Sequence, residues 1–224
     1  MIAKLLLQNL IWTVAMGALL FVPAGTLHWT AAWVFLGTIA ILGLAGGLWL
    51  ARTDPALLAE RLRPTMQSGQ PAADKKFMLA FGVAALAWFV AMGLDRRYHA
   101  SHVPPALQGL GWAMLLLSSG FMMWAMRENS FAAPVIKLQT ERGHRVVSTG
   151  PYAFVRHPMY SGIVLFFAGA ALHLGSWWGA AMSPLFAWLF AIRAGIEERA
   201  LIAGLPGYAE YTSRVRYRLV PGLW

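Results

Sequence analysis

Long apolar stretches, separated by polar segments, make up most of the chain. They cover residues 5–22, 29–51, 77–94, 107–126, 158–174 and 177–192. Because a helix needs about 20 apolar residues to cross the hydrocarbon core of a bilayer, this pattern predicts an all-α, polytopic integral membrane protein. The last two stretches are short and only Gly175 and Ser176 separate them, so we expect either two full spans or a tilted or re-entrant hairpin. The expected number of transmembrane helices is therefore five to six.

Two longer polar segments interrupt the apolar pattern. Residues 54–74 contain three prolines and predict a loop with a short amphipathic helix near residues 56–62. Residues 128–157 are too polar to span a bilayer, and a connection of about thirty residues between helices is typical of a functional loop. We therefore expect two parts: residues 1–127 with four N-terminal spans, and residues 128–224 with the polar loop, a helical hairpin and an amphipathic C-terminal segment.

Composition and charge agree with a membrane protein. The chain is 58% hydrophobic and 12% charged, whereas an ordinary soluble domain is about a quarter charged. With the N-terminus inside, 16 of the 18 Lys and Arg residues fall on one side of the membrane, and only Arg96 and Arg97 fall on the other. The positive-inside rule then places both termini and both long polar segments in the cytoplasm. The membrane topology thus explains the net charge of +9, which does not indicate nucleic-acid binding. The expected partner is the lipid bilayer.

Several common cofactor and metal sites are excluded or unsupported. The chain has no cysteine, so it has no thiolate metal site, no disulfide and no cysteine nucleophile. It has neither a Gly-x-Gly-x-x-Gly fingerprint after a strand nor a P-loop sequence, which excludes those two nucleotide-binding motifs. His99 and His102 have no acidic neighbours, so no metal site is predicted.

Candidate chemistry lies at the start of the last hairpin. Pro158 suits the first position of a helix, which places His157 at the helix N-terminus. Tyr160 follows three residues later and faces the same side. The free amide groups of such a helix end favour a carboxylate or a phosphate. A plainer interpretation, in which His157 and Arg156 only mark the head-group interface, stays open.

The end of the hairpin carries a second polar group. Arg193 and Glu197 are four residues apart and share a helix face, whereas Glu198 points about 100° away. These residues continue an apolar span, where charges are costly unless they are paired or line a cavity. That position favours a functional site over a solvated helix end.

In combination and order, these residues resemble the isoprenylcysteine carboxyl methyltransferase family and the related membrane phospholipid methyltransferases. The matching positions are Gln139, His144 to Val147, Gly150-Pro151-Tyr152, Arg156-His157-Pro158, Tyr160, Gly162, Arg193, Glu197-Glu198 and Val220-Pro221. The resemblance implies an all-helical membrane fold that binds S-adenosylmethionine in a cytoplasmic pocket. The C-terminal half would form this pocket, and the C-terminal segment would close it.

The resemblance also implies roles for single residues. The implied cofactor-binding residues are Gln139, His144, Val147, Tyr152, His157, Pro158, Tyr160 and Glu197. Arg193 is the implied substrate-holding residue. A carboxylate or thiolate acceptor needs a cation but no general base, whereas an amine acceptor needs a base, for which Glu198 and His157 are both candidates. The implied reaction is methyl transfer to a lipophilic small molecule or prenylated substrate, such as an isoprenylcysteine carboxylate.

Other functions stay open beside this one. A phospholipid or a thiol is an alternative methyl acceptor. An NADPH-dependent membrane reductase of the sterol-reductase type shares the Arg-His-Pro-x-Tyr motif, but the Glu197-Glu198 pair fits the methyltransferases better, and a 2′-phosphate calls for a denser basic cluster. A membrane scaffold or transporter subunit would explain the charge asymmetry, but not the polar residues at the ends of the last hairpin.

Overall fold

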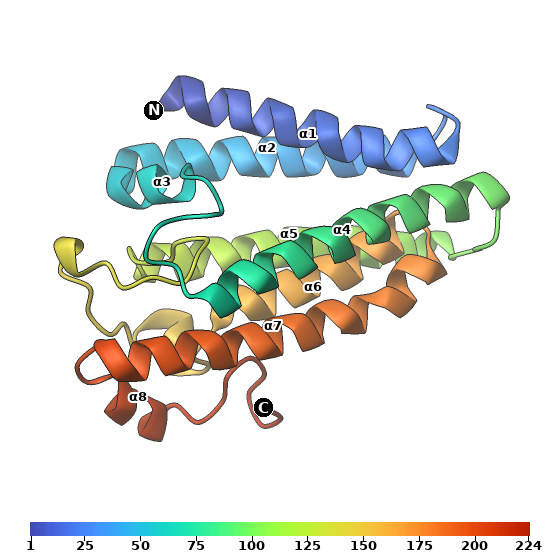
Figure 1. Cartoon of the computed structure of the whole chain (residues 1–224). Helices are drawn as coiled ribbons and strands as arrows, with labels where there is room; N and C mark the ends of the chain where they lie inside the picture. The colour runs from blue at the N-terminus through green and yellow to red at the C-terminus, as the bar shows by residue number, and fades with distance from the viewer.

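Six longer helices form a bundle in the computed structural model, which describes residues 1–224 (Figure 1). They are α1 (Ile2–Ala24), α2 (Thr30–Thr53), α4 (Ala72–Tyr98), α5 (Pro105–Glu128), α6 (Pro158–His173) and α7 (Trp177–Gly204). The short elements are α3 (Pro55–Arg61), the 3-10 turns η1 (Thr140–Arg142) and η2 (Gly150–Ala153), and α8 (Tyr208–Arg214). The predicted all-α class is confirmed.

Five of these helices, α1, α2, α4, α5 and α7, are long and apolar enough to cross a membrane. The helix α6 has only 16 residues, whereas α7 has 28. The expectation of a short last span is therefore wrong for α7, which continues from residue 192 to Gly204. This continuation is possible because its charged residues Arg193 and Glu198 are buried in ion pairs.

The helices alternate in direction, which brings the polar segments to one end of the bundle. The helices α1, α4 and α6 begin at this end, and α2, α5 and α7 finish there. The N-terminus, α3, residues 129–157 and α8 also lie there, and we call it the loop end (Figure 1). Nearly all basic residues are at the loop end, while Arg96 and Arg97 close α4 at the opposite end.

The short helix α3 forms where the sequence predicts it. Pro55 occupies its first turn, and the Asp54 side chain accepts a hydrogen bond of 2.9 Å from the amide of Leu57. Such a cap satisfies one of the free amide groups at a helix start. The helix ends at Arg61, whose guanidinium donates to the carbonyl of Ala132 in the long loop.

An aromatic core holds α4, α6 and α7 together. The rings of Phe167 and Phe186 stack with centroids 3.6 Å apart, and Trp88 packs edge to face against both, at 77° and 80°. The Trp88 indole N–H also donates to the carbonyl of Gly179, so its only polar atom is satisfied.

Close packing on α5 fixes the short helix α6. A Cβ atom added at Gly111 would lie 2.5 Å from the carbonyl oxygen of Gly169, so the two backbones touch. Nearer the loop end, the Ser118 hydroxyl donates to the carbonyl of Gly162 over 2.8 Å. The second contact holds the beginning of α6, close to Tyr160 and to His157, the residue before the helix.

Candidate functional site

A cavity of about 270 Å³ lies at the loop end. Residues of the 129–157 segment form one wall, the beginning of α6 and the end of α7 form another, and α8 closes it. The volume is near the lower end of the range for small-molecule pockets, about 300 Å³. Glu197 is the only carboxylate that lines the cavity. The lining cations are Arg61, Lys137, Arg145, Arg156 and Arg193.

The fold brings most of the sequence-predicted site residues to this cavity. Those that line it are His144, Val147, Tyr152, His157, Pro158, Tyr160, Arg193 and Glu197. Six of them come from residues 144–160, whereas Arg193 and Glu197 come from α7, so the tertiary structure brings two parts of the chain together. Gln139 and Glu198 are not among the lining residues.

Gln139 lies behind the cavity wall and is fully buried. Its side-chain amide donates to the carbonyl of Phe131 over 2.8 Å and accepts from Arg142. Its backbone amide donates to Nδ1 of His144 over 3.3 Å. The rings of Phe131 and His144 stack with centroids 4.5 Å apart, so Gln139 fixes an aromatic wall of the cavity.

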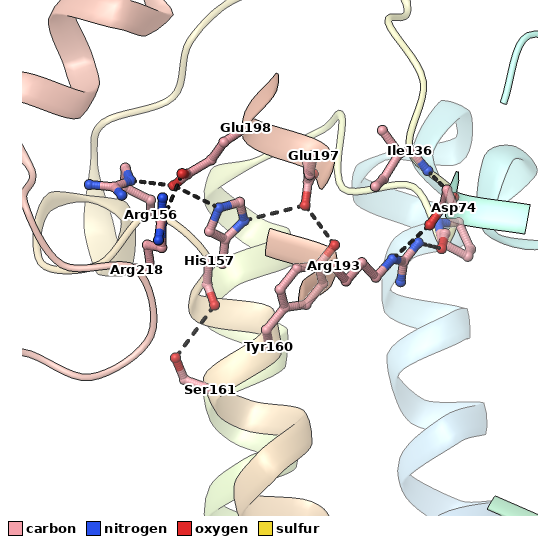
Figure 2. A network of polar contacts seen from close by, with 11 residues as sticks. Asp74, Ile136, Arg156, His157, Tyr160, Ser161, Arg193, Glu197, Glu198 and Arg218 are labelled. Atoms are coloured by element: carbon pink, nitrogen blue, oxygen red, sulfur yellow. Dashed lines mark hydrogen bonds and ion pairs between the residues drawn. The ribbon is translucent and has the colours of Figure 1, made fainter. Parts of the chain in front are cut away.

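His157, Tyr160 and Glu197 form a hydrogen-bonded group at the cavity (Figure 2). The Tyr160 hydroxyl donates to Oε2 of Glu197 over 2.6 Å, and Nδ1 of His157 lies 3.3 Å from the same oxygen. The His157 and Tyr160 rings are parallel, with centroids 5.2 Å apart. The Glu197 side chain keeps 28% of its surface exposed, which allows it to face a ligand.

His157 has carboxylates at both ring nitrogens, because Nε2 lies 3.3 Å from Oε1 of Glu198. Burial by itself lowers the pKa of His157. The hydrogen bonds and charges of Glu197 and Glu198 outweigh burial and raise this pKa above its ordinary value. The arrangement therefore suits an imidazolium that donates from both nitrogens.

Glu198 is the centre of an ion-pair cluster outside the cavity (Figure 2). Its carboxylate accepts from Nε of Arg156 over 2.5 Å and from Nε of Arg218 over 2.8 Å, and only 6% of its side chain is exposed. Of the two candidate bases, only His157 faces the cavity. The position of Glu198 fits a structural role better than that of a general base.

Arg193 is paired with a residue from the N-terminal half of the chain. Its Nε donates to Oδ1 of Asp74 over 3.0 Å, and its Nη2 donates to the carbonyl of Pro134 over 2.6 Å. Its guanidinium also lies 4.9 Å from the centroid of Phe77 and 5.5 Å from that of Tyr160. Its Nη1 makes no hydrogen bond to the protein, and the residue lines the cavity.

Asp74 is fully buried and was not among the sequence-predicted site residues. Besides Arg193, it accepts from the Gln70 side chain over 2.7 Å and from the backbone amide of Ile136 over 3.0 Å. It therefore ties the start of α4 to the long loop and to α7. The only signal in the sequence was an acidic residue beside an apolar run, which is also typical of an exposed helix start.

The C-terminal segment covers the cavity. The backbone amides of Arg156 and His157 donate to the carbonyls of Tyr217 and Arg218, each over 2.9 Å. The Tyr211 hydroxyl donates to the carbonyl of Tyr152 over 2.7 Å. Tyr208 and Tyr211 line the cavity, although the sequence showed only a segment that alternates aromatic and basic residues.

Comparison with known proteins defines the class of protein. Residues 107–204, which run from the first turn of α5 to the end of α7, match the family model for phospholipid methyltransferases. The match contains the start of α6 and the end of α7, where His157, Tyr160, Arg193 and Glu197 lie. With the apolar helices, it identifies the chain as a membrane methyltransferase.

A solved structure has the same fold. It is the eukaryotic intramembrane Ras methyltransferase, isoprenylcysteine carboxyl methyltransferase. The two chains are 20% identical and superimpose with a TM-score of 0.54 over 97% of this chain and 85% of the other. The chain thus has an isoprenylcysteine carboxyl methyltransferase-like fold. No curated protein sequence matches it significantly.

Proposed function

We propose that this membrane methyltransferase binds S-adenosylmethionine in the loop-end cavity and methylates a lipophilic acceptor such as an isoprenylcysteine carboxylate. The observation that carries the proposal is Glu197, the only carboxylate in a cavity lined mainly by aromatic, apolar and basic side chains. We infer that the site lies in the cytoplasm, together with both termini, because the loop end holds nearly all basic residues. Residues 128–224 are assigned the role of a methyltransferase core, and residues 1–127 that of N-terminal membrane spans.

The cavity residues suit the chemical groups of this cofactor. A carboxylate at Glu197 matches the positive charge of an ammonium or sulfonium group. The faces of Phe131 and His144 provide a flat wall for a purine ring. Burial lowers the pKa of His144 and outweighs the opposing charge of Glu197, which favours the neutral ring. Gln139 would act on the cofactor indirectly, through these two rings.

The residues of the site perform the tasks that methyl transfer needs. When bound, S-adenosylmethionine supplies a methyl group on a positively charged sulfur, which keeps the electron pair of the broken bond. Tyr160 and His157 hold Glu197 in place, and the C-terminal segment excludes water, which strengthens electrostatic interactions in the site. A carboxylate acceptor then requires no proton transfer, and alignment supplies most of the rate enhancement.

Calorimetric titration of the detergent-purified protein with S-adenosylhomocysteine, and in parallel with NADPH, tests the proposal. We expect saturable binding of S-adenosylhomocysteine alone. Glu197→Gln should weaken this binding at least about tenfold, since it removes the negative charge that faces the ligand. Binding of NADPH alone would overturn the proposal in favour of a reductase.

A second set of variants separates cofactor binding from acceptor binding. Arg193→Ala should retain S-adenosylhomocysteine binding and lose turnover. This change leaves the Asp74 carboxylate buried without its partner, which could destabilise the fold. The double variant Arg193→Ala/Asp74→Asn removes that charge as well and is therefore the control for stability. Equal losses of cofactor binding in the Glu197 and Arg193 variants would contradict the division of roles.

A further inference from the structure

A separate cavity, of about 390 Å³, lies at the end of the bundle opposite to the loop end, and we call it the far pocket. It is formed by the start of α2, the end of α4, the start of α5 and the turn between α6 and α7. The helix α6 has 16 residues and is therefore about 24 Å long, so the far pocket is well separated from the loop-end cavity. Most of its lining residues are polar, and the charged or titratable ones are His28, Asp95, Arg96, His99 and His102. The proposed function assigns no role to any of them.

The floor of the far pocket carries a carboxylate with one unpaired oxygen. Asp95 is only 2% exposed, and its Oδ2 accepts hydrogen bonds from the hydroxyl groups of Ser101 and Ser176 over 2.6 and 2.5 Å. Its Oδ1 is buried and has no hydrogen-bond partner in the protein. Because an unsatisfied buried acceptor is costly, and more so when it is charged, this oxygen indicates that the pocket takes up a donor, preferably a cation.

Arg96 lies at the exposed edge of the far pocket, directly after Asp95 in the sequence. It forms no ion pair with the protein. Its Nη2 donates to the carbonyl of His28 over 3.2 Å, and its Nε and Nη1 make no hydrogen bond to the protein. His99 and His102 also line the pocket and are exposed. The edge therefore offers donors to an anion, whereas the floor offers an acceptor to a cation.

Exposed tryptophans place the far pocket at the level of the lipid head groups. Trp177 and Trp178 begin α7, and Trp33 lies near the start of α2. Tryptophans at the ends of spans mark the interface between hydrocarbon and water. The head group of a lipid at this end of the bundle can therefore reach the pocket while its chains stay in the hydrocarbon.

We propose that the far pocket binds the phosphoethanolamine head group of a phospholipid, with the ammonium on Asp95 and the phosphate on Arg96. The buried carboxylate and the exposed arginine match the order of charges in this group, whose ammonium is at the tip and whose phosphate is next to the chains. A choline head group is disfavoured, because its quaternary ammonium has no N–H to donate to Oδ1. Aromatic faces recognise such a group, and Trp29 is the only Trp, Tyr or Phe residue that lines the pocket. A lipid held here stabilises the fold and is too far from the loop-end cavity to be the methyl acceptor.

Titration of the detergent-purified protein with dihexanoylphosphatidylethanolamine, and in parallel with dihexanoylphosphatidylcholine, tests this proposal. The unfolding midpoint temperature reports binding, because a ligand that binds only the folded state stabilises it in proportion to the logarithm of its concentration over Kd. We expect the Kd for the ethanolamine lipid to be at least about tenfold lower than that for the choline lipid, since only the first donates a charge-assisted hydrogen bond to Asp95.

Three variants locate the bound head group. Arg96→Gln removes an exposed charge and should raise the Kd for the ethanolamine lipid at least about tenfold. Asp95→Asn keeps a carbonyl oxygen for the two serine hydroxyls and puts an amide N–H in place of the unpaired oxygen, so it should abolish the preference for ethanolamine over choline. Arg97→Gln is the matched control, since Arg97 is the next residue, is exposed and does not line the far pocket, and its Kd should equal that of the wild type.

The outcomes decide the proposal independently of the proposed function. Equal affinities of the wild type for the two lipids, or an unchanged Kd in Arg96→Gln, would overturn it. Free O-phosphoethanolamine identifies the source of the head group: weaker binding than that of the lipid supports a lipid ligand, whereas equal binding would show that the pocket takes a soluble ligand and would refute the lipid. Binding of S-adenosylhomocysteine should be the same in the wild type and in Arg96→Gln, because Arg96 does not line the loop-end cavity.

Discussion

Two polar clusters meet at the end of α7, and they differ in where their residues come from (Figure 2). The first surrounds Glu197 and Glu198, and its partners His157, Arg156 and Arg218 all belong to the C-terminal half of the chain. The second joins Arg193 to Asp74, a partner 119 residues away on α4. Tyr160 lies between them, with its hydroxyl on Glu197 and its ring against the Arg193 guanidinium.

The difference shows how one helix end serves two purposes. In the first cluster, two carboxylates share three cationic partners and one of them, Glu197, stays partly exposed toward the cavity. In the second cluster, a single buried carboxylate neutralises a single buried arginine. The first cluster can therefore adjust to a ligand, whereas the second is a fixed connection between the two halves of the chain.

The largest effect is expected where the fixed connection is broken. Asp74→Ala leaves Arg193 buried without its counterion, and removal of one partner of a buried ion pair costs about 3–5 kcal/mol. Thermal unfolding in detergent should therefore show a strong decrease in the midpoint temperature. The double variant Asp74→Ala/Arg193→Met should recover much of the loss, because replacing both charges with apolar groups removes the desolvation cost.

The pairing of Asp74 with Arg193 could not be predicted from the sequence, unlike several local features. The apolar stretches predicted the spans, and Pro158 predicted the start of α6, because both depend on local composition and local backbone chemistry. Helical spacing predicted that His157 and Tyr160 share one face and that Arg193 and Glu197 share another, because residues three or four apart lie on the same side of a helix, and both pairs line the cavity. Asp74 and Arg61 were not among the predicted residues, because contacts with α7 and with the long loop bring them to this end of the bundle.

The length of α7 illustrates the same limit. Charged residues after Ile192 suggested the end of a span, since unpaired charges are costly in an apolar helix. The helix instead continues to Gly204, because Arg193 and Glu198 find partners on other elements. Whether such a charge ends a span thus depends on tertiary contacts, which local spacing does not determine.

A smaller and pH-dependent effect is expected in the first cluster. The charged and titratable groups that face His157 are Glu197, Glu198, Arg156, Tyr160 and Arg218. Because the folded-state pKa of His157 is raised, its protonated form stabilises the fold fully below the unfolded-state pKa, about 6.5. This contribution is lost as the pH rises through the folded-state pKa.

Unfolding midpoints of the wild type and His157→Gln, measured from pH 6 to pH 9, test this expectation. The difference between the two proteins should be greatest at the acidic end and should shrink as the pH rises. A difference that stays constant over this range would mean that His157 acts only through packing and neutral hydrogen bonds. The Asp74→Ala effect should not follow this curve, because His157 makes no contact with the second cluster.

The smallest effect is expected at the outer edge of the first cluster. The Arg218 side chain is 35% exposed, so solvent screens its ion pair with Glu198, and Arg218→Gln should cost at most about 0.5 kcal/mol of stability. The same substitution should weaken S-adenosylhomocysteine binding about twofold at low salt and leave it unchanged at high salt, because salt screens exposed ion pairs. Arg216→Gln is the matched control, since Arg216 lies two residues away, is exposed and forms no ion pair. A larger loss of stability or affinity that persists at high salt would show that Arg218 fixes the C-terminal segment as firmly as Asp74 fixes Arg193. The contrast between an adjustable and a fixed cluster would then be wrong.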